Sequence, residues 1–277
     1  MSAQNPSHSQ GVTGVLATAR TGKVAAARKL LQSKYRQEAN EFLAEGPQAV
    51  REALAAGVVR EVFATVQAAE RHPDLAAGAL LCDEEALAGL TTSQNPQGIV
   101  ALCARHFSSL SDVWASNPAL LVGLMYVRDP GNAGAVLRVA DAAGAQGVVF
   151  SSQSVDPSND KVVRASTGSV FHLPVVVDIS PDELIDGARK RGMQILVADA
   201  SGVDLDELAD EGTLTKPTLW LMGNEAWGVP EEILRQADIT VRVPIYGKAE
   251  SLNLATAAAV CLYSSARAMR TGFTTRS

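Results

Sequence analysis

The sequence predicts an α/β protein in which a small α/β unit precedes a larger unit built on a parallel sheet with helices on both faces. From Leu120 onward, apolar runs without polar alternation are separated by helix patterns, which is typical of strands buried on both faces. Residues 106–118 have the composition of a linker and divide the chain. At 277 residues the chain is long enough for two modest domains with their own cores.

The first unit is expected over 22–106, after a Ser/Gln/Gly/Thr-rich tail that we predict to be disordered over 1–21. Apolar residues at helical spacing predict a helix from Gly22 to about Ser33. The remaining expected elements are strands over 41–46, 58–65, 80–82 and 98–104, and helices over 47–57 and 83–90.

The second unit is expected over 120–272, after a linker over 107–119. Its apolar strand patterns lie at 120–127, 147–150, 175–177, 194–199, 218–222 and 239–245. Its helix patterns lie at 133–143, 160–168, 181–191, 229–237 and 252–269.

Composition and motif searches exclude several classes of protein. The four histidines show no metal-ligand spacing, so we predict no metal site. No G-x-S-x-G or phosphate-binding P-loop sequence is present, and the dinucleotide fingerprint is incomplete. No apolar run approaches the ~18 residues of a membrane span. The three widely spaced cysteines favour a reducing compartment, and the N-terminus lacks a signal-peptide pattern, so we predict a cytoplasmic protein with no membrane partner.

Charge is distributed unevenly along the chain. The net charge is −6, but residues 1–37 carry six basic residues and no acidic one, so this head is +6 and the remainder −12. A basic head of this kind indicates a nucleic-acid-binding arm or helix, although a solvated helix face has the same composition.

Three polar loops follow apolar strands, and the carboxyl ends of parallel strands share one ligand-binding edge. In the first loop, 127–144, Asn132 occupies an expected helix N-cap, where free amides favour an anion. Arg138 lies one turn after Gly134, whose missing side chain is expected to let the guanidinium reach toward the loop. An ordinary cap and a surface arginine are the alternative.

The second and third loops add further polar groups. Gly223 is expected to let a ligand approach the backbone, and Glu225 to accept a hydrogen bond from a hydroxyl or amine. The alternative for Glu225 is a charge in the first turn of a helix. In the third loop, 243–260, Ser251 is expected to cap a long Ala-rich helix with Asn253 in its first turn, and a well-capped core helix is the alternative.

Together these segments resemble the signature motifs of the SpoU/TrmH family of SPOUT RNA methyltransferases, in the right order and spacing. The motifs are D-P-G-N-A-G-A-V-L-R-V-A-D-A-A-G at 129–144, L-M-G-N-E-A-W-G-V at 221–229 and V-P-I-Y-G-K-A-E-S-L-N-L-A-T-A-A-A-V at 243–260. Further matches are F-L-A-E-G-P-Q-A-V-R-E-A-L, N-P-Q-G-I-V-A-L and K-V-V-R-A-S-T-G-S-V-F-H-L-P-V, and the resemblance covers about 22–270. The first two of these look like the ribosomal-protein-like substrate-binding domain that precedes the catalytic domain in many members.

The resemblance implies transfer of a methyl group from S-adenosyl-L-methionine to a ribose 2′-hydroxyl of RNA by a homodimer with a C-terminal trefoil knot. Large-subunit ribosomal RNA is the expected substrate, because N-terminal domains of this type occur in the ribosomal-RNA members, and transfer RNA is the alternative.

By motif position, the resemblance also assigns site residues. Those matching catalytic and RNA-phosphate positions are Asn132, Arg138, Glu225, Ser251 and Asn253. Those matching cofactor contacts are Gly223, Val243, Ile245 and Leu252. RNA contacts are expected from Arg20, Lys23, Arg28 and Lys29 of the basic head, and from Arg164, which is a candidate to assist Arg138 from the partner chain.

Three alternatives stay open. The family proposal gives Arg138 the role of base, but a guanidinium with a pKa above about 12 is nearly always protonated, so Arg138 would need a charged neighbour or would only orient the RNA. A nicotinamide-dependent oxidoreductase shares the α/β pattern but lacks its glycine fingerprint here. A non-enzymatic RNA-binding protein with a degenerate methyltransferase domain is the third alternative.

Overall fold

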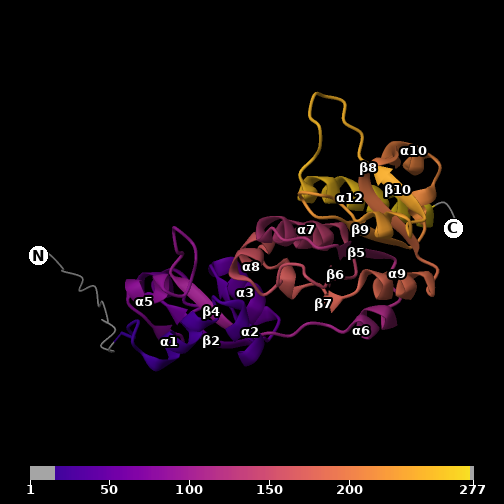
Figure 1. Ribbon diagram of the computed structural model, residues 1–277. Coiled ribbons are helices and arrows are strands. Elements are labelled where there is room, and N and C mark those ends of the chain that lie inside the picture. Colours follow the sequence, from indigo (N-terminus) through magenta and orange to yellow (C-terminus); the bar gives the residue numbers. More distant parts are fainter. Residues whose placement is uncertain (1–15, 275–277) are drawn as a thin grey trace, which may run out of the picture.

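The computed structural model describes residues 16–274 and contains two sheets, one in each half of the chain (Figure 1). The first sheet has four strands in the order β1-β4-β2-β3, and the second has six in the order β10-β8-β9-β5-β6-β7. All neighbouring strands of the second sheet are parallel, which confirms the predicted fold class.

The N-terminal half consists of short elements around a mainly antiparallel sheet. In chain order they are α1 (Gly22–Lys29), α2 (Ser33–Ala39), β1 (Glu41–Glu45), α3 (Pro47–Ala55), β2 (Val59–Ala64), α4 (Val66–Arg71), β3 (Leu80–Leu81), α5 (Glu84–Ala88) and β4 (Ile99–Ala104). Strand β4 pairs antiparallel with both β1 and β2, and β2 pairs parallel with β3.

The start of the chain differs from the expectation. The predicted helix from Gly22 to Ser33 is wrong in extent, because it stops at Lys29 and α2 follows after a short turn. Ala17 was expected in a disordered tail, yet it is buried and bridges to Cys82. Its N–H donates to the Leu81 carbonyl at 2.8 Å, a pairing across 64 residues that local composition does not reveal. Residues 1–15 of the expected tail lie outside the described residues.

The segment expected as a linker contains a helix. Helix α6 (Leu110–Ala115) begins with a capping box in which Ser109 and Asp112 exchange hydrogen bonds. Val113 and Trp114 are buried against the second sheet, together with residues of the next helices and strands. This stretch therefore belongs structurally to the larger sheet unit, and its S-L-S-D capping signal was visible in the sequence.

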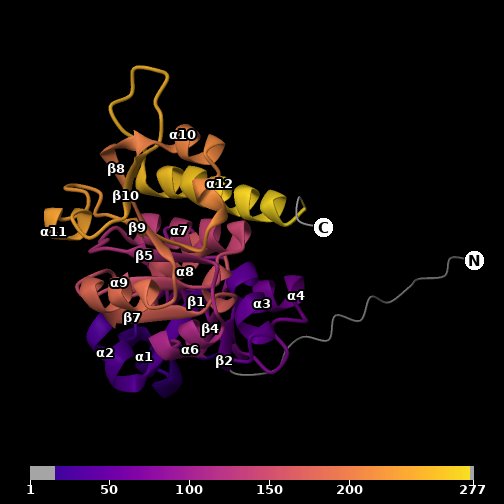
Figure 2. The same ribbon diagram turned by 90° about the vertical axis from the view of Figure 1, so that its right-hand side faces the viewer.

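The C-terminal half alternates strands and helices. Its elements are β5 (Leu120–Leu124), α7 (Pro130–Ala143), β6 (Val148–Ser151), α8 (Asp160–Ser166), η1 (Ser169–Phe171), β7 (Val175–Ile179), α9 (Pro181–Arg189), β8 (Gln194–Asp204), α10 (Leu205–Asp210), η2 (Thr213–Thr215), β9 (Thr218–Met222), α11 (Glu231–Leu234), β10 (Ile239–Arg242) and α12 (Leu254–Thr274). The segment 243–253 between β10 and α12 projects away from both sheets (Figures 1 and 2).

Both faces of the larger sheet are covered, as its apolar strands require. On β9, Trp220 faces a core shared with α7, α10 and α12, whereas Leu221 faces a core shared with α6 and α9. The Trp220 indole N–H donates to Ser265 Oγ at 2.9 Å, so the one polar atom of this fully buried ring is satisfied by α12.

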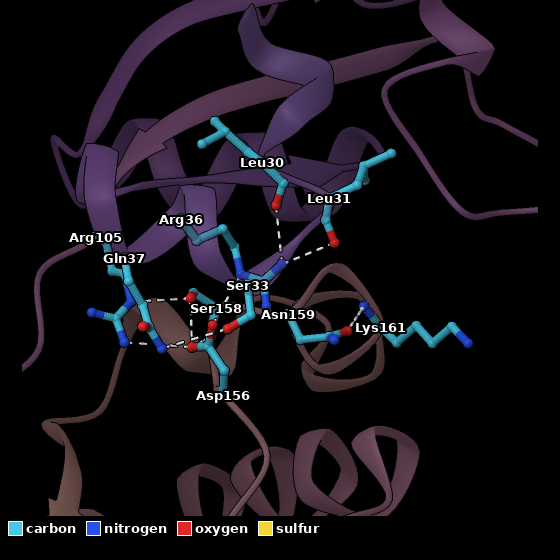
Figure 3. Close-up of polar contacts among 10 residues, drawn as sticks. All are labelled: Leu30, Leu31, Ser33, Arg36, Gln37, Arg105, Asp156, Ser158, Asn159 and Lys161. Carbon is cyan, nitrogen blue, oxygen red and sulfur yellow. Dashed lines mark hydrogen bonds and ion pairs between the residues drawn. The ribbon is translucent and has the colours of Figure 1, made fainter.

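The two halves meet through charged side chains. Arg36 of α2 lies 2.9 Å from Asp156, and its guanidinium also donates to the carbonyls of Leu30 and Leu31 (Figure 3). Arg164 of α8 lies 2.8 Å from Glu45 at the end of β1. These pairs hold the small sheet unit against the β6–α8 side of the large one.

Candidate functional site

A cavity of about 400 Å³ lies at the carboxyl ends of β9 and β10, beside the middle of β8. Its wall comes from the three loops that the sequence singled out, from the end of β10 and from the middle of β8. The lining residues are Asn132, Ala198, Asp199, Ala200, Met222, Gly223, Asn224, Glu225, Val241, Arg242, Val243, Ile245, Glu250, Ser251, Leu252, Asn253, Leu254 and Ala257. All the predicted catalytic and cofactor residues except Arg138 are therefore brought together.

Asn132 connects the three loops. Its amide nitrogen donates to Glu225 Oε1 at 3.3 Å, and its amide oxygen accepts from Asn253 Nδ2 at 2.8 Å. Asn132 is not the helix cap that the sequence predicted: Asp129 caps α7, accepting from the Asn132 N–H at 2.7 Å, and Pro130 occupies the first turn. The cap fixes the backbone of Asn132, so its side chain is free to bridge the second and third loops.

The second loop is held by Asn224, a residue that the motif analysis passed over. Asn224 is buried; its amide donates to the Tyr126 carbonyl at 2.8 Å and its oxygen accepts from the Ala226 N–H at 2.9 Å. A paired backbone bridge to Gly228 closes the turn. A buried amide directly before an exposed carboxylate fixes where Glu225 emerges, and its position between Gly223 and Glu225 was the available signal.

Gly223 is required by the turn itself, and its expected contact with a ligand stays a prediction. A Cβ at this position would lie 2.4 Å from the Gly228 carbonyl carbon and 2.5 Å from the Val229 nitrogen. The missing side chain therefore allows the loop to fold back onto its own backbone. A ligand can still contact Gly223, which lines the cavity, but the turn alone already requires glycine.

The third loop is capped by Asn253, not by Ser251 as predicted. Helix α12 starts at Leu254, and Asn253 Oδ1 accepts from the Ala255 N–H at 2.9 Å. Ser251 lies ahead of the helix on the cavity wall beside Leu252. The same amide of Asn253 thus caps the helix through its oxygen and binds Asn132 through its nitrogen.

Arg138 stands apart from this cavity. It is exposed on α7, does not line the cavity, and has no hydrogen bond or ion pair within the described part of the chain. The expected path over Gly134 is wrong, because a Cβ there would lie 2.5 Å from the Val162 carbonyl and 2.6 Å from Ala165. Helix α8 fills the space beside Gly134, and the Arg138 side chain is exposed to solvent.

Carboxylates dominate the charge of the cavity. Asp199 and Glu250 join Glu225 on the wall. Among residues 16–274, Arg242 is the one cation on this wall, and it lies 3.6 Å from Asp204. Asp199 follows the buried part of β8, so the same rule of strand ends that selected the other loops would have found it. The cavity therefore favours a ligand with positive groups.

The residues predicted to contact RNA fall into two groups. Arg20, Arg28 and Lys29 are exposed, and Lys23 is exposed but lies 2.6 Å from Glu61. Arg164 is different, because its guanidinium contacts Glu45, Asp160 and Thr92 between the two halves. Its RNA contact stays a prediction.

Within residues 16–274, no group of three or more His, Cys, Asp or Glu side chains is arranged to hold a metal ion. The helices of the same region include none with the length and apolarity needed to cross a membrane. The three cysteines are free and buried, and burial raises the pKa of Cys103 and of Cys261 to about 12, which keeps both thiols protonated and unreactive.

Fold and site together define a two-part α/β protein whose acidic, ligand-sized pocket lies at the carboxyl edge of a parallel sheet. The chain belongs to the SpoU rRNA Methylase family, whose model matches residues 119–263. Residues 22–101 match a second model, the MRM3-like substrate binding domain. The resemblance seen in the sequence motifs is thereby confirmed.

Two relatives with assigned activities match most of the chain and about half of it, respectively. It is 35% identical over 251 residues to the 23S rRNA (guanosine(2553)-2′-O)-methyltransferase RlmP of Bacillus subtilis, covering 89% of this chain and 96% of the relative. It is 38% identical over 162 residues to the 23S rRNA (uridine(2479)-2′-O)-methyltransferase of Streptomyces viridochromogenes, covering 55% of each.

Solved structures agree with the fold. The AdoMet-bound rRNA methyltransferase from Sinorhizobium meliloti superposes with a TM-score of 0.76 at 33% identity, covering 91% of this chain and 97% of that one. The SpoU methyltransferase AviRb from Streptomyces viridochromogenes in complex with AdoMet gives a TM-score of 0.77 at 28% identity, covering 90% and 98%.

Proposed function

We propose that this protein transfers a methyl group from S-adenosyl-L-methionine to a ribose 2′-hydroxyl of large-subunit ribosomal RNA. The observation that carries the proposal is the hydrogen-bonded contact of Asn253, Asn132 and Glu225, which joins the three family motifs at one cavity. Family membership and relatives that methylate 23S rRNA at the 2′-oxygen support the reaction and the substrate class.

The cavity suits this cofactor by its size and charge. Its volume of about 400 Å³ lies in the range of small-molecule sites. The carboxylates of Asp199, Glu225 and Glu250 complement a ligand that carries an ammonium and a sulfonium group. Met222, Val243 and Leu252 supply apolar surface for its adenosine part. When bound, the cofactor supplies an electrophilic methyl group.

The chain's own residues have to place a ribose hydroxyl and remove its proton. Because the Asn132 amide binds Glu225 and Asn253 at once, it holds the carboxylate at the cavity mouth, where Glu225 can accept a hydrogen bond from the hydroxyl. Arg138, exposed and unpaired within residues 16–274, is placed on the outside of α7, where it can bind an RNA phosphate. We assign it to phosphate positioning and not to proton abstraction, because a guanidinium stays protonated. The hydroxyl proton then leaves to water as the methyl group is transferred to the ribose oxygen.

We further propose the division of labour that the sequence predicted. The unit at 22–106 binds RNA through Lys23, Arg28 and Lys29, together with Arg20 just before it. The unit at 120–272 catalyses, and 107–119, whose helix α6 packs on the larger sheet, connects the two. Exposure of these cations and the match to a substrate-binding model support the first part. Likeness to solved SpoU structures supports the C-terminal trefoil knot.

Homodimer formation belongs to the same proposal. Val260 and Tyr263 are exposed apolar side chains on α12, which packs beside α7 (Figure 2). A second copy seated on these helices would cover both side chains. Ribosomal RNA as substrate and three free thiols support a cytoplasmic location.

Methyl transfer to RNA tests the proposal. Labelled S-adenosylmethionine and total RNA from cells lacking the gene would be incubated with the protein, and the RNA separated by size before alkaline hydrolysis. Label recovered in alkali-resistant dinucleotides from large ribosomal RNA is the expected result. Label in transfer RNA would keep the enzyme and replace the substrate, and no label in any RNA or ribosomal particle would refute the proposed reaction.

A further inference from the structure

A second cavity lies at the same sheet edge, between the two halves of the protein. Its volume is about 440 Å³, and its wall comes from both units. Gln37 and Arg105 line it from the first unit, and Ser151, Gln153, Asp156 and Asp178 from the second. It lies at the carboxyl ends of β6 and β7, whereas the first cavity lies at the carboxyl ends of β9 and β10 and beside the middle of β8.

A short hydrogen-bonded path joins the two cavities across the end of β5. Asn224 of the first cavity donates to the Tyr126 carbonyl at 2.8 Å, and the Tyr126 N–H donates to Ser151 Oγ of the second at 2.8 Å. The Val155 N–H is bonded to the Val127 carbonyl at 2.8 Å. A chain molecule bound at the first cavity can thus reach the second by running along one sheet edge.

The charges on the wall decide which part of an RNA fits. Arg105 and Arg36 both face Asp156, at 3.6 and 2.9 Å, so this carboxylate is compensated (Figure 3). Burial alone would raise the pKa of Asp156, but hydrogen bonds from Ser158 and the Arg36 charge lower it overall, so the group stays ionised. The Asp178 carboxylate has no hydrogen bond or ion pair among the residues that the structure describes.

An uncompensated carboxylate repels phosphate and accepts hydrogen bonds. The part of an RNA that offers donors is the edge of an unpaired base, and unpaired bases are the usual targets of sequence-specific RNA recognition. Guanine presents two adjacent N–H donors on its Watson–Crick edge, which match the two oxygens of one carboxylate. The planar guanidinium of Arg105, 4.5 Å from the Phe107 ring, provides a flat surface on the same wall.

We infer that the cavity between the two units is a subsite for an unpaired guanine of the substrate RNA, with Asp178 as the residue that reads the base. This inference rests on the proposed function, since it assigns a specificity residue to the same reaction. Gln153 and Ser152 supply further polar groups at its wall, and Gln37 brings a contact from the substrate-binding unit.

Binding of short RNAs to the full chain tests the inference. The probes are a uridine octamer and three octamers with one central guanine, adenine or cytosine, and fluorescence anisotropy at constant salt gives each dissociation constant. The test variant is Asp178→Asn. Asp178 is exposed at φ 60°, a conformation that asparagine also adopts readily, so the substitution preserves the fold. The matched control is Asp186→Asn, an exposed carboxylate on α9 outside both cavities.

The wild type is expected to bind the guanine octamer about tenfold more tightly than the uridine octamer, a usual effect of one bidentate base contact. Asp178→Asn should lose this preference and keep its affinity for the uridine octamer, and Asp186→Asn should match the wild type. Equal affinities in the wild type, or a preference that survives in Asp178→Asn, would overturn the inference. Methyl transfer is assayed separately. An active enzyme that binds the guanine and uridine octamers equally would refute only the subsite. An inactive protein that still prefers the guanine octamer would refute only the proposed reaction.

Discussion

At the scale of single residues, the site depends on amides that each serve two neighbours. Asn253 caps α12 and binds Asn132; Asn132 in turn binds Glu225. Because each amide bonds to two neighbours, Asn253 helps to position Asn132, and Asn132 helps to position Glu225. The Glu225 carboxylate is therefore held by Asn132 of the first loop, which Asn253 of the third loop positions, and the Asn224 side chain fixes its own loop.

Replacement of Asn132 by alanine should reduce catalysis without unfolding the protein. Asn132→Ala removes one hydrogen bond to a carboxylate and one to Asn253, so kcat/KM for RNA methylation is expected to fall about 10- to 100-fold. Steady-state methyl transfer measures this effect. Asn117→Gly, at an exposed left-handed turn before β5, is the matched control and should retain activity. Full activity in Asn132→Ala would contradict the assigned contact.

The residues also show what sequence could and could not predict. The rule of strand ends selected Asn132, Glu225, Ser251 and Asn253, which do meet at one cavity. The hydrogen-bond partners within the site were not predictable. The sequence does not show whether Asp129 or Asn132 caps α7, or whether Asn253 or Ser251 caps α12. The environment of Arg138 was mispredicted for a similar reason, since nothing local reveals that a later helix fills the space beside Gly134.

At the scale of elements, close packing of α7 on α8 fixes the helix that carries Asn132. Gly134 allows this approach, and Val162 and Ala165 of α8 occupy the space of its missing side chain. The long helices were predictable because their apolar periodicity continues over several turns. The strands were predictable because each has a run of several apolar residues. The short helices α2, α4 and α10, of six or seven residues each, were missed, whereas the similarly short α5 and α8 were predicted.

A methyl group at Gly134 should therefore disturb the packing of α7. Gly134→Ala places a Cβ 2.5 Å from a carbonyl oxygen of α8, and the helices must separate. We expect the free energy of unfolding to fall by about 1–3 kcal/mol, the usual cost of overpacking. Urea denaturation measures it, with Gly22→Ala as control, because a Cβ at Gly22 has no neighbour within 4 Å. Equal stability of both variants would show that α7 and α8 are not tightly packed.

At the scale of the whole molecule, charged side chains join the two halves. Arg36, with 3% of its side chain exposed, pairs with Asp156 across the boundary, and His172 bridges Asp141 and Glu52. In the sequence, Arg36 belonged to the basic head that we interpreted as an RNA-binding feature. Only the assembled fold shows that this one cation is used for domain packing, since its partner lies 120 residues away.

Loss of Asp156 should be costly. Asp156→Ala leaves the buried Arg36 charge without its carboxylate, and breaking a buried pair in this way destabilises proteins by about 3–5 kcal/mol. Chemical denaturation of the full chain measures the change. Glu38→Ala, which removes the exposed partner of Lys34 on the same helix, should cost less than about 1 kcal/mol. A small effect of Asp156→Ala would mean that water reaches the interface.

The contribution of His172 should depend on pH. Hydrogen bonds to Asp141 and then to Glu52 raise the pKa of His172 above its ordinary value of 6.5. A raised pKa in the folded state stabilises the protein fully below about pH 6.5, and this stabilisation is lost as the pH rises through the raised value. The difference in unfolding free energy between wild type and His172→Gln should thus be largest in mild acid and shrink toward alkaline pH. A difference that grows with pH would contradict the assigned ion pairs.

The central claim is that the three motif loops form one methyltransferase site acting on ribosomal RNA. The most direct measurement is a map of ribose 2′-O-methylation in ribosomal RNA, read from resistance to alkaline cleavage, in cells with and without the gene. We expect deletion to remove methylation at one position of the large-subunit RNA, the wild-type gene to restore it, and Asn132→Ala to restore little. An unchanged map after deletion, or full restoration by Asn132→Ala, would contradict the account.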